Sequence, residues 1–346
     1  MAGKYIAYVG SYTRGKSKGI TVFDVDEAFN FKKRFTYEIN NPSYVQMSYD
    51  QKFLYTSCDE GVAAFRILDN GGLTFLNKAS VNGLRPCYLS VDKKNQYLLA
   101  AGYHDGKMTV LKLNKDGSVS HVTDEVFMTG IGTEMGRHYM CHVNCAIFSP
   151  DERFVFSVDM GLDQVKIYEF DHKKGKLKLH GILRCEIDDG PKHMVFSNDG
   201  KYAYLTFENK NVVKQYAYDA ENAKFTEMQS LSTLPKSASD YSNAVTLKIT
   251  PDDKYLYVTN SGNNSVAVYK IDEQTKEMSE ICILQISGEY PKDIVLMGDG
   301  QTFVCVNQIS DSMTFFKMDY EKGFFTMQKK PIELYSPTTM QIKKLS

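Results

Sequence analysis

NPSYVQMSYDQKFLYTSCDEGVAAFRIL, residues 41–68, is the stretch that decides the fold, because it recurs in altered form along the chain. It reads as an apolar strand, a polar turn, a strand opened by an aromatic residue, a short loop and an alternating strand. Alternation of apolar and polar residues with period 2 indicates β-strands. Further copies begin at Arg85, His142, Gly190, Ser242 and Tyr290.

The copies are nearly evenly spaced. Their second strands are predicted to open at Phe53, Tyr97, Phe154, Tyr202, Tyr255 and Thr302, with successive differences of 44, 57, 48, 53 and 47 residues. Intervals of this size are typical of kelch-type propeller blades. The turns SYDQK, SPDER, SNDGK and TPDDK suit tight antiparallel connections. Helical periodicity is nowhere sustained, so the sequence predicts an all-β protein with four-stranded antiparallel blades.

The two ends of the chain together supply one more copy. KYIAYVGSYTRGKSKGITVFDV, residues 4–25, matches the second and later strands of a copy, and SPTTMQIKKL from Ser336 resembles the first strand NPSYVQMS. A C-terminal strand that completes the first blade closes the ring and removes an exposed sheet edge. We therefore predict one seven-bladed β-propeller domain over residues 1–346. An open β-solenoid would not need complementary ends.

Composition and charge restrict the class of protein. Hydrophobic residues make up 42% of the 346 residues, and 41 Lys and Arg stand against 42 Asp and Glu, a net charge of -1. This balance favours a soluble protein and predicts neither nucleic acid nor a membrane as partner. The N-terminus lacks the pattern of a signal peptide, and no stretch is apolar for the 18 or so residues that span a bilayer.

The seven cysteines are dispersed and form no CxxC pair. Cys141 and Cys145 lack the two further nearby ligands that a zinc site requires. We therefore expect reduced thiols in a cytoplasmic protein, with no metal and no cofactor. The expected assembly is a monomer or a weak homo-oligomer.

The topology predicts where polar residues from different copies meet. In a four-stranded meander, the start of the first strand and the end of the second share one face, and the first strand lies innermost. Residues expected around the channel mouth are Arg85, Tyr103, His104, Arg137, His138, His142, Asn144, Asp159, Lys192, His193, Glu208, Asn260, Ser261, Lys292, Asn307 and Gln308. Channels of propellers are polar in general, but imidazoles, cations and a carboxylate together indicate a site for an anionic small molecule.

One interval between copies is longer than the rest. It contains HVTDEVFMTGIGTEMGRHYMCH, residues 121–142, which we expect to be an insertion between the third and fourth blades. Insertions in repeat proteins commonly lie on one face and often serve binding.

Several of these phrases resemble the lactonase family of seven-bladed propellers. They are GSYTRGKSKGI, RPCYLSVD, AGYHDGKMTVL, RHYMCHVNCAIFSPDERFVFSVDMGLDQVKIYEFD and GPKHMVFSNDGKYAYLTFE, and the similarity runs from Tyr5 to about Gln341. The family includes a bacterial 6-phosphogluconolactonase and the fungal carboxy-cis,cis-muconate lactonizing enzyme. The resemblance implies the propeller fold and a lactone as substrate.

The family's site motifs are only partly kept. The fourth-blade motif of the family looks like RQ-x-x-x-H-x-H and reads RHYMCHVN here, so Arg137 and His142 match, His138 replaces Gln and Asn144 replaces the second His. The resemblance also matches Glu208 to a catalytic Glu. One substrate-binding Arg becomes Lys192, and a second falls at Ser261 and is lost.

The resemblance implies a lactonase with Glu208 as a catalytic residue, and we expect His142 to act as the second catalytic residue in place of the missing His. His142 lies two residues before Asn144, so alternation along a strand would point both to one face. The residues expected to bind the substrate are Lys192, Arg137, Asn144, His193, Arg85 and His104. The changed positions make muconate cyclisation the poorer fit, and an anionic sugar lactone such as 6-phosphogluconolactone the better one.

A different class of function stays open at this point. The losses at Asn144 and Ser261 are also what a non-catalytic propeller that binds a small anion or a protein would show. A WD-type scaffold has less support, since the sequence shows no evident apolar patch on the faces.

Overall fold

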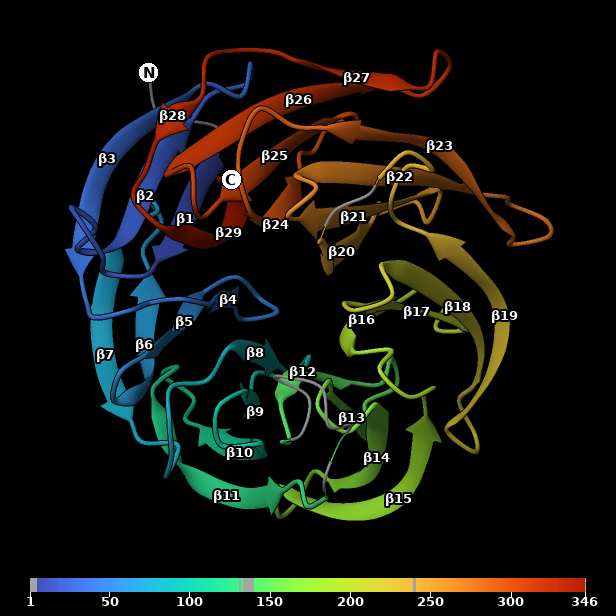
Figure 1. The fold of residues 1–346 in the computed structure, drawn as a ribbon. Coiled ribbons are helices and arrows are strands. Elements are labelled where there is room, and N and C mark those ends of the chain that lie inside the picture. Colours follow the sequence, from blue (N-terminus) through green and yellow to red (C-terminus); the bar gives the residue numbers. More distant parts are fainter. Residues whose placement is uncertain (1–4, 131, 133–139, 239–240, 346) are drawn as a thin grey trace.

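In the computed structural model, which describes residues 5–130, 132, 140–238 and 241–345, seven antiparallel sheets form a ring around a central axis (Figure 1). Six sheets are formed by strands that follow one another in the chain. The seventh has the order β29-β1-β2-β3 and joins the two ends of the chain. Numbering this sheet blade 1 and the others in chain order gives blades 1 to 7. The predicted seven-bladed propeller is confirmed.

The innermost strands line the axis. They are β29 (Pro337–Lys344), β4 (Val45–Met47), β8 (Tyr88–Val91), β12 (Val143–Phe148), β16 (Pro191–Phe196), β20 (Asn243–Ile249) and β24 (Pro291–Leu296), for blades 1 to 7. The second strands are β1 (Tyr5–Ser11), β5 (Phe53–Cys58), β9 (Tyr97–Gly102), β13 (Phe154–Asp159), β17 (Tyr202–Phe207), β21 (Tyr255–Ser261) and β25 (Thr302–Asn307). All six second-strand starts predicted from the sequence are confirmed.

The outer half of each blade completes the meander. The third strands are β2 (Gly19–Val25), β6 (Gly61–Ile67), β10 (Lys107–Leu113), β14 (Gln164–Asp171), β18 (Val212–Asp219), β22 (Ser265–Ile271) and β26 (Ser312–Asp319). The fourth are β3 (Phe31–Glu38), β7 (Leu73–Ala79), β11 (Val119–Phe127), β15 (Lys176–Arg184), β19 (Lys224–Ser232), β23 (Met278–Gln285) and β27 (Phe324–Met327), and β28 (Ile332–Glu333) also pairs with β26. Across the described ranges, no helix is long and apolar enough to span a bilayer.

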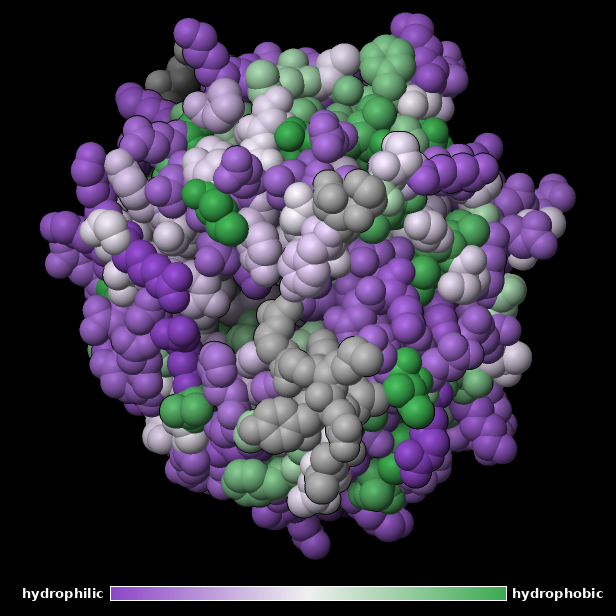
Figure 2. All heavy atoms as spheres, in the orientation of Figure 1, coloured by the Kyte–Doolittle hydropathy of each residue, from purple (hydrophilic) through white to green (hydrophobic). Residues whose placement is uncertain are grey.

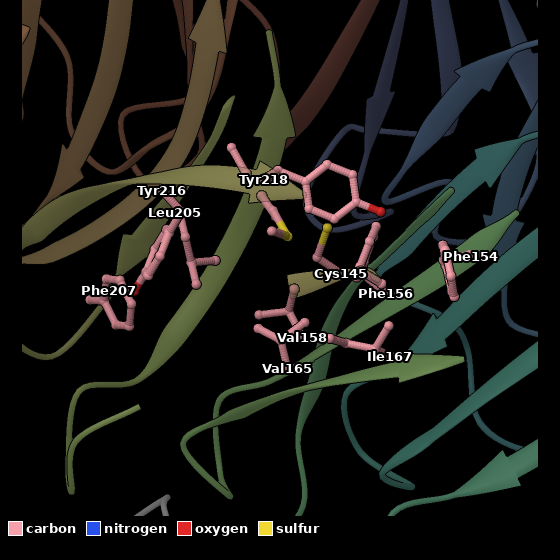
Figure 3. Close-up of a cluster of buried hydrophobic side chains, with 13 residues drawn as sticks. Cys145, Phe154, Phe156, Val158, Val165, Ile167, Leu205, Phe207, Tyr216 and Tyr218 are labelled. Carbon is pink, nitrogen blue, oxygen red and sulfur yellow. The ribbon is translucent and has the colours of Figure 1, made fainter. Parts of the chain in front are cut away.

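The hydrophobic core is divided into clusters that lie between neighbouring blades. Each of the seven interfaces between blades holds one cluster. Figure 3 shows the cluster between blades 4 and 5, where Phe156 and Val158 face Leu205 and Tyr218. Successive residues of one strand serve different clusters: in β1, Tyr8 packs toward blade 2 and its neighbours in the strand pack toward blade 7. Alternation therefore distributes apolar side chains to both faces of a sheet.

The ring closes through β29. This strand pairs antiparallel with β1 from Tyr5 to Ser11, so the last strand of the chain becomes the inner strand of the first blade. Met340 of β29 is 1% exposed and belongs to the cluster shared by blades 7 and 1. The predicted closure by complementary ends is confirmed.

The turns between first and second strands repeat one hydrogen-bond pattern. The Ser48 hydroxyl donates to Asp50 at 2.8 Å, and Ser149, Ser197 and Thr250 make the same contact two residues on at 2.6–2.7 Å. A short polar side chain that bonds its own turn stabilises a tight reversal. These contacts explain why the turn sequences contain Ser or Thr followed by Asp.

The expected insertion at 121–142 needs correction. Residues up to Phe127 belong to β11, the outermost strand of blade 3, and pair with β10. The alternating apolar residues Val122 and Val126 belong to that strand pattern. Much of the remainder, including Arg137 and His138, lies outside the described residues.

We expect the closing strand to contribute strongly to stability. Met340→Ala should lower the free energy of unfolding by roughly 2–5 kcal/mol, because it removes a fully buried side chain and leaves a cavity between blades 7 and 1. Urea denaturation followed by circular dichroism measures the change. The matched control is Met327→Ala, since Met327 is 45% exposed and should shift stability by less than about 0.5 kcal/mol. Equal effects of the two substitutions would contradict this role for β29.

Candidate active site

A cavity of about 290 Å³ opens at the face where the inner strands begin. Figure 2 looks onto this face and shows a hollow near its middle. All seven blades contribute to its wall. The lining residues are Tyr12, Ser43, Tyr44, Cys87, Tyr88, Tyr103, His104, Asn144, Lys192, His193, Glu208, Val245, Thr246, Lys248, Tyr290, Lys292, Asp293, Thr338 and Thr339.

Most of these residues occupy equivalent positions of the repeat. When the copies are aligned on their turns, one position per blade forms an outer ring: Ser43, Cys87, Asn144, Lys192, Val245, Lys292 and Thr338. The next position forms a second ring deeper in the cavity: Tyr44, Tyr88, His193, Thr246, Asp293 and Thr339. In blade 4 this second position is Cys145, which packs in the core between blades.

In blades 1, 5, 6 and 7, two successive residues of the inner strand face the cavity where a β-bulge interrupts the alternation. The register between the inner and second strands shifts in five blades. In blades 4 to 7 the shifts lie between Val143 and Cys145, Pro191 and Met194, Ala244 and Leu247, and Pro291 and Asp293. In blade 1 the extra residue is Thr338, because Gly10 pairs with Thr339 and Ser11 pairs with Pro337. A bulge places an extra residue in one strand and redirects its side chain. The bulges account for both ring residues in these four blades, whereas the bulge of blade 4 turns Asn144 to the cavity and leaves Cys145 in the core.

An ion pair joins two of the lining residues. The Lys192 ammonium donates to the Glu208 carboxylate, and both side chains are largely buried. Burial disfavours the charged form of Lys192, but the adjacent carboxylate outweighs this effect and leaves the pKa of Lys192 raised above its ordinary value. Lys192 is thus a cation at neutral pH, fixed beside a carboxylate at the cavity wall.

A second pair of opposite charges lies nearby. Lys248 approaches Asp293 at 3.6 Å, and the other Asp293 oxygen accepts hydrogen bonds from the Thr339 hydroxyl and the Met340 backbone N–H. Asp293 therefore connects blade 7 to blade 6 and to the closing strand. This carboxylate is thus supplied with donors from two other blades.

His193 is held as a neutral imidazole. Burial, assisted by the neighbouring Lys248 and Lys192 ammonium groups, lowers the pKa of His193 to about 3. Its Nδ1 accepts the backbone N–H of Leu247 at 3.3 Å, so the proton resides on Nε2, which faces the Tyr88 hydroxyl at 3.5 Å. The ring is consequently a donor toward the cavity rather than a base at neutral pH.

Comparisons with known proteins now decide the family. Residues 6–342 match the model of a protein family described as "Lactonase, 7-bladed beta-propeller". The chain belongs to this lactonase family. It is 32% identical to a 6-phosphogluconolactonase of Bacillus subtilis, with 98% of both chains covered. Among solved structures it is similar to a candidate 6-phosphogluconolactonase from Bacteroides fragilis, with TM-score 0.90, 27% identity and 98% of both chains covered. A periplasmic gluconolactonase of Pseudomonas aeruginosa shares the fold, with TM-score 0.92, 24% identity and 99% of both chains covered.

Five of the predicted site residues of this lactonase-family propeller line one cavity. They are Asn144, Lys192, His193, Glu208 and His104. The Asn144 side-chain Nδ2 is buried and has no hydrogen-bond partner among the described residues. An unpaired buried donor is costly, so Asn144 has one strong hydrogen bond left to offer a ligand.

His142 does not share the position of Asn144. The register shift after Val143 breaks the alternation that predicted a common face, and His142 is not among the described residues that line the cavity. Its ring stacks on the lining residue Tyr103 at 4.2 Å, and its Nδ1 donates to the Tyr103 carbonyl oxygen at 2.7 Å. His142 therefore reaches the cavity wall through Tyr103.

Other expected residues have different places. Arg85 pairs with Asp59 at 2.7 Å and lies behind Tyr12, and Arg137 lies outside the described residues. Asn260 and Asn307 are fully buried, and their side-chain amides donate to groups within or beside their own blades. They stabilise loops rather than line the cavity. The set of residues expected at the channel mouth was too large, because it included residues that face a neighbouring strand as well as residues that face the axis.

Sequence reasoning placed Tyr103 at the cavity but missed Lys248, Asp293 and the other wall tyrosines, Tyr12, Tyr44, Tyr88 and Tyr290. A signal for several of them exists in the repeat. The tripeptides PSY, PCY, PKH, PKD and PTT, which begin at Pro42, Pro86, Pro191, Pro291 and Pro337, place Tyr44, Tyr88, His193, Asp293 and Thr339 at one equivalent position. Aligning the copies at this proline would have identified the second ring. The described residues contain no group of three or more His, Cys, Asp or Glu that could hold a metal ion.

The depressed pKa of His193 has a measurable consequence for stability. Between about pH 6.5 and pH 3 the unfolded chain binds a proton at this residue while the folded protein does not, so stability falls as the pH is lowered through this window. The pH dependence of the free energy of unfolding should be steeper in wild type than in His193→Gln by up to about 1.4 kcal/mol per pH unit. Urea unfolding at pH 4 to 6 measures both slopes. Parallel curves would show that His193 titrates alike in both states.

Proposed function

We propose that the protein hydrolyses an anionic sugar lactone, with 6-phosphogluconolactone as substrate and 6-phosphogluconate as product. The observation that carries the proposal is the buried Lys192–Glu208 pair in a cavity that also presents Lys248 and Lys292. The name of the Bacillus subtilis relative supports the choice of substrate. The cavity is of the size expected for a small metabolite.

The charge of the cavity favours an anion. Among the described lining residues, the three lysines Lys192, Lys248 and Lys292 outnumber the two carboxylates Glu208 and Asp293 by one positive charge. Because His193 is neutral, it adds no charge to the wall. A phosphate group would accept charge-assisted hydrogen bonds from the lysines. Lys292 and Lys248 are assigned to the phosphate, since Lys192 is assigned to the oxyanion beside Glu208.

The proposed chemistry begins with attack of water on the lactone carbonyl. Glu208 takes a proton from the water as its oxygen bonds to the carbonyl carbon, and the tetrahedral intermediate carries an oxyanion. Asn144 Nδ2 and the Lys192 ammonium are placed to stabilise that oxyanion. On collapse, the bond from carbon to the ring oxygen breaks and Glu208 returns the proton to this leaving oxygen.

A thiol nucleophile is not required. Cys87 lines the cavity, but burial raises the pKa of its thiol to about 11, so little thiolate exists at neutral pH. Water activated by Glu208 is therefore the nucleophile in the proposal. A substrate phosphate or oxyanion that draws Lys192 toward itself would weaken the ion pair and make Glu208 a stronger base.

The remaining predicted roles belong to the same proposal. His142 acts through the Tyr103 side of the wall, and His104 and His193 contribute donors at the mouth and the second ring. Arg137 is retained as a proposed substrate-binding residue from the family motif alone. The proposed location remains the cytoplasm.

The first test of function is the loss of the proposed base. Purified protein should accelerate hydrolysis of 6-phosphogluconolactone above the buffer rate, and Glu208→Gln should lower kcat by about 100- to 10,000-fold. The matched control is Glu125→Gln, because Glu125 pairs with the buried Lys107 at 2.6 Å outside the cavity. That control should keep kcat within about twofold. If wild type and Glu208→Gln both match the buffer rate, the lactonase proposal fails.

The second test concerns the phosphate. Lys292→Met should raise KM for 6-phosphogluconolactone about 10- to 100-fold, the effect of removing one charge-assisted hydrogen bond, and should affect gluconolactone much less. Lys112→Met is the control, since Lys112 lies over the Tyr97 ring at 3.9 Å and does not line the cavity. Equal losses with both lactones would show that Lys292 does not select the phosphate.

The alternative is a propeller that binds an anion without turning it over. The unpaired amide at Asn144, in place of the family's second His, is the observation that favours it. A thermal-shift screen with sugar phosphates and dicarboxylates distinguishes the two functions, because a ligand that binds only the folded state raises the melting temperature. Stabilisation by 6-phosphogluconate with no hydrolysis of any lactone would establish the binder.

A further inference from the structure

Tyr12 occupies an unusual position at the rim of the cavity. It follows β1 in blade 1 and lines the cavity, and two guanidinium groups lie against its ring: Arg14 at 5.1 Å and Arg85 at 5.3 Å from the centroid. Its backbone N–H donates to the Ser336 carbonyl at 3.0 Å, which ties it to the start of the closing strand. The two guanidinium groups therefore hold the Tyr12 ring, and the hydrogen bond to Ser336 holds its backbone.

A network of polar contacts runs behind Tyr12 across three blades. Arg85 donates to Asp59 at 2.7 Å, and the Asn41 side-chain amide donates to both Asp59 oxygens at 3.0 Å. The Asn41 side-chain oxygen in turn accepts the backbone N–H of Thr13 at 2.9 Å. The network thus begins at a group that touches the Tyr12 ring and ends at the residue after Tyr12.

The backbone at Asn41 has a conformation that recurs in the repeat. Asn41 has a φ of 49°, in the left-handed region that few non-glycine residues adopt. Its own N–H donates to the Thr13 hydroxyl at 3.3 Å. Gly190, Tyr290 and Ser336 occupy the equivalent position of the repeat and also have positive φ, so this conformation belongs to the entry of an inner strand.

Arg85 is poorly placed to bind a substrate anion itself. It is not among the described lining residues, and the Asp59 carboxylate already neutralises its charge. We propose that Tyr12 contacts the bound ligand and helps to determine specificity, and that Arg85 is a positioning residue that acts through the Tyr12 ring. This inference rests on the proposed function for the identity of the ligand, and it changes the role expected for Arg85 from anion anchor to support.

A double-mutant cycle tests the assignment. Tyr12→Leu should raise KM for 6-phosphogluconolactone about three- to tenfold, and Arg85→Met about two- to fivefold, with kcat within twofold in both. In the Tyr12→Leu background, Arg85→Met should cause no further rise, because its effect passes through the missing ring. Asp59→Asn should resemble Arg85→Met and serves as a second variant if that protein folds poorly. Multiplicative effects in the cycle, or no effect of Arg85→Met and Asp59→Asn, would overturn the proposal.

The control is an arginine with the same local contacts away from the cavity. Arg153 pairs with Asp151 at 2.6 Å and lies 5.6 Å from the Phe154 ring, at the turn between the first and second strands of blade 4. Arg153→Met should leave KM unchanged. A rise equal to that of Arg85→Met would mean that loss of an arginine pair alone accounts for the effect, and would overturn the positioning role.

A readout without turnover separates this inference from the proposed function. With 3-fluorotyrosine incorporated, the Tyr12 ¹⁹F resonance, identified by its loss in Tyr12→Phe, should shift in Arg85→Met and on addition of 6-phosphogluconate, and should not shift in Arg153→Met. If no lactone is hydrolysed but these shifts occur, the catalytic proposal fails and the ligand-contact role of Tyr12 stands. An unchanged Tyr12 resonance in Arg85→Met, or on saturation with 6-phosphogluconate, would overturn it.

Discussion

The structure depends on one constraint: each sheet is apolar on both faces and has to be covered on both. A blade in the middle of a row meets this requirement with its two neighbours, but the first and last blades of an open row could not. The chain resolves this by pairing β29 with β1, so that blades 7 and 1 bury a cluster like those of the other interfaces. Closure supplies the last of the seven interfaces and removes the free edge of β1 at the same time.

The cavity is a consequence of that closure. Seven inner strands that start at one face must bring their first residues around a common axis, and these residues are far apart in the chain. Thr338, at one end of the sequence, thus shares a wall with Ser43 and Lys192. The β-bulges then turn two residues per strand toward the axis in most blades, which makes the wall dense enough to hold both charges and aromatic rings.

The chemical character of the wall differs between its sides. Blades 5 to 7 provide the charged groups around Lys192, Lys248 and Asp293, whereas blades 1 to 3 provide tyrosines such as Tyr12, Tyr44 and Tyr88. A ligand with a charged end and a ring of carbon atoms fits such a division, because charge-assisted hydrogen bonds and aromatic contacts favour different parts of it. The neutral state of His193 maintains this division, since burial next to two ammonium groups opposes a further positive charge.

The amino-acid sequence alone determined the all-β class, the number of blades, the starts of the second strands and the closure of the ring. Each of these follows from local alternation and from a repeat that can be counted, as the starts at Phe53 and Tyr97 show. It also placed Lys192, Glu208 and Asn144 at one cavity, because equivalent positions of a repeat must meet at the axis. The tertiary structure alone decided that His142 stacks on Tyr103 and that the Arg85 guanidinium lies against the Tyr12 ring. The physical reason is that a register shift of one residue reverses which way a side chain points, and such a shift depends on pairing with a second strand rather than on the strand's own sequence.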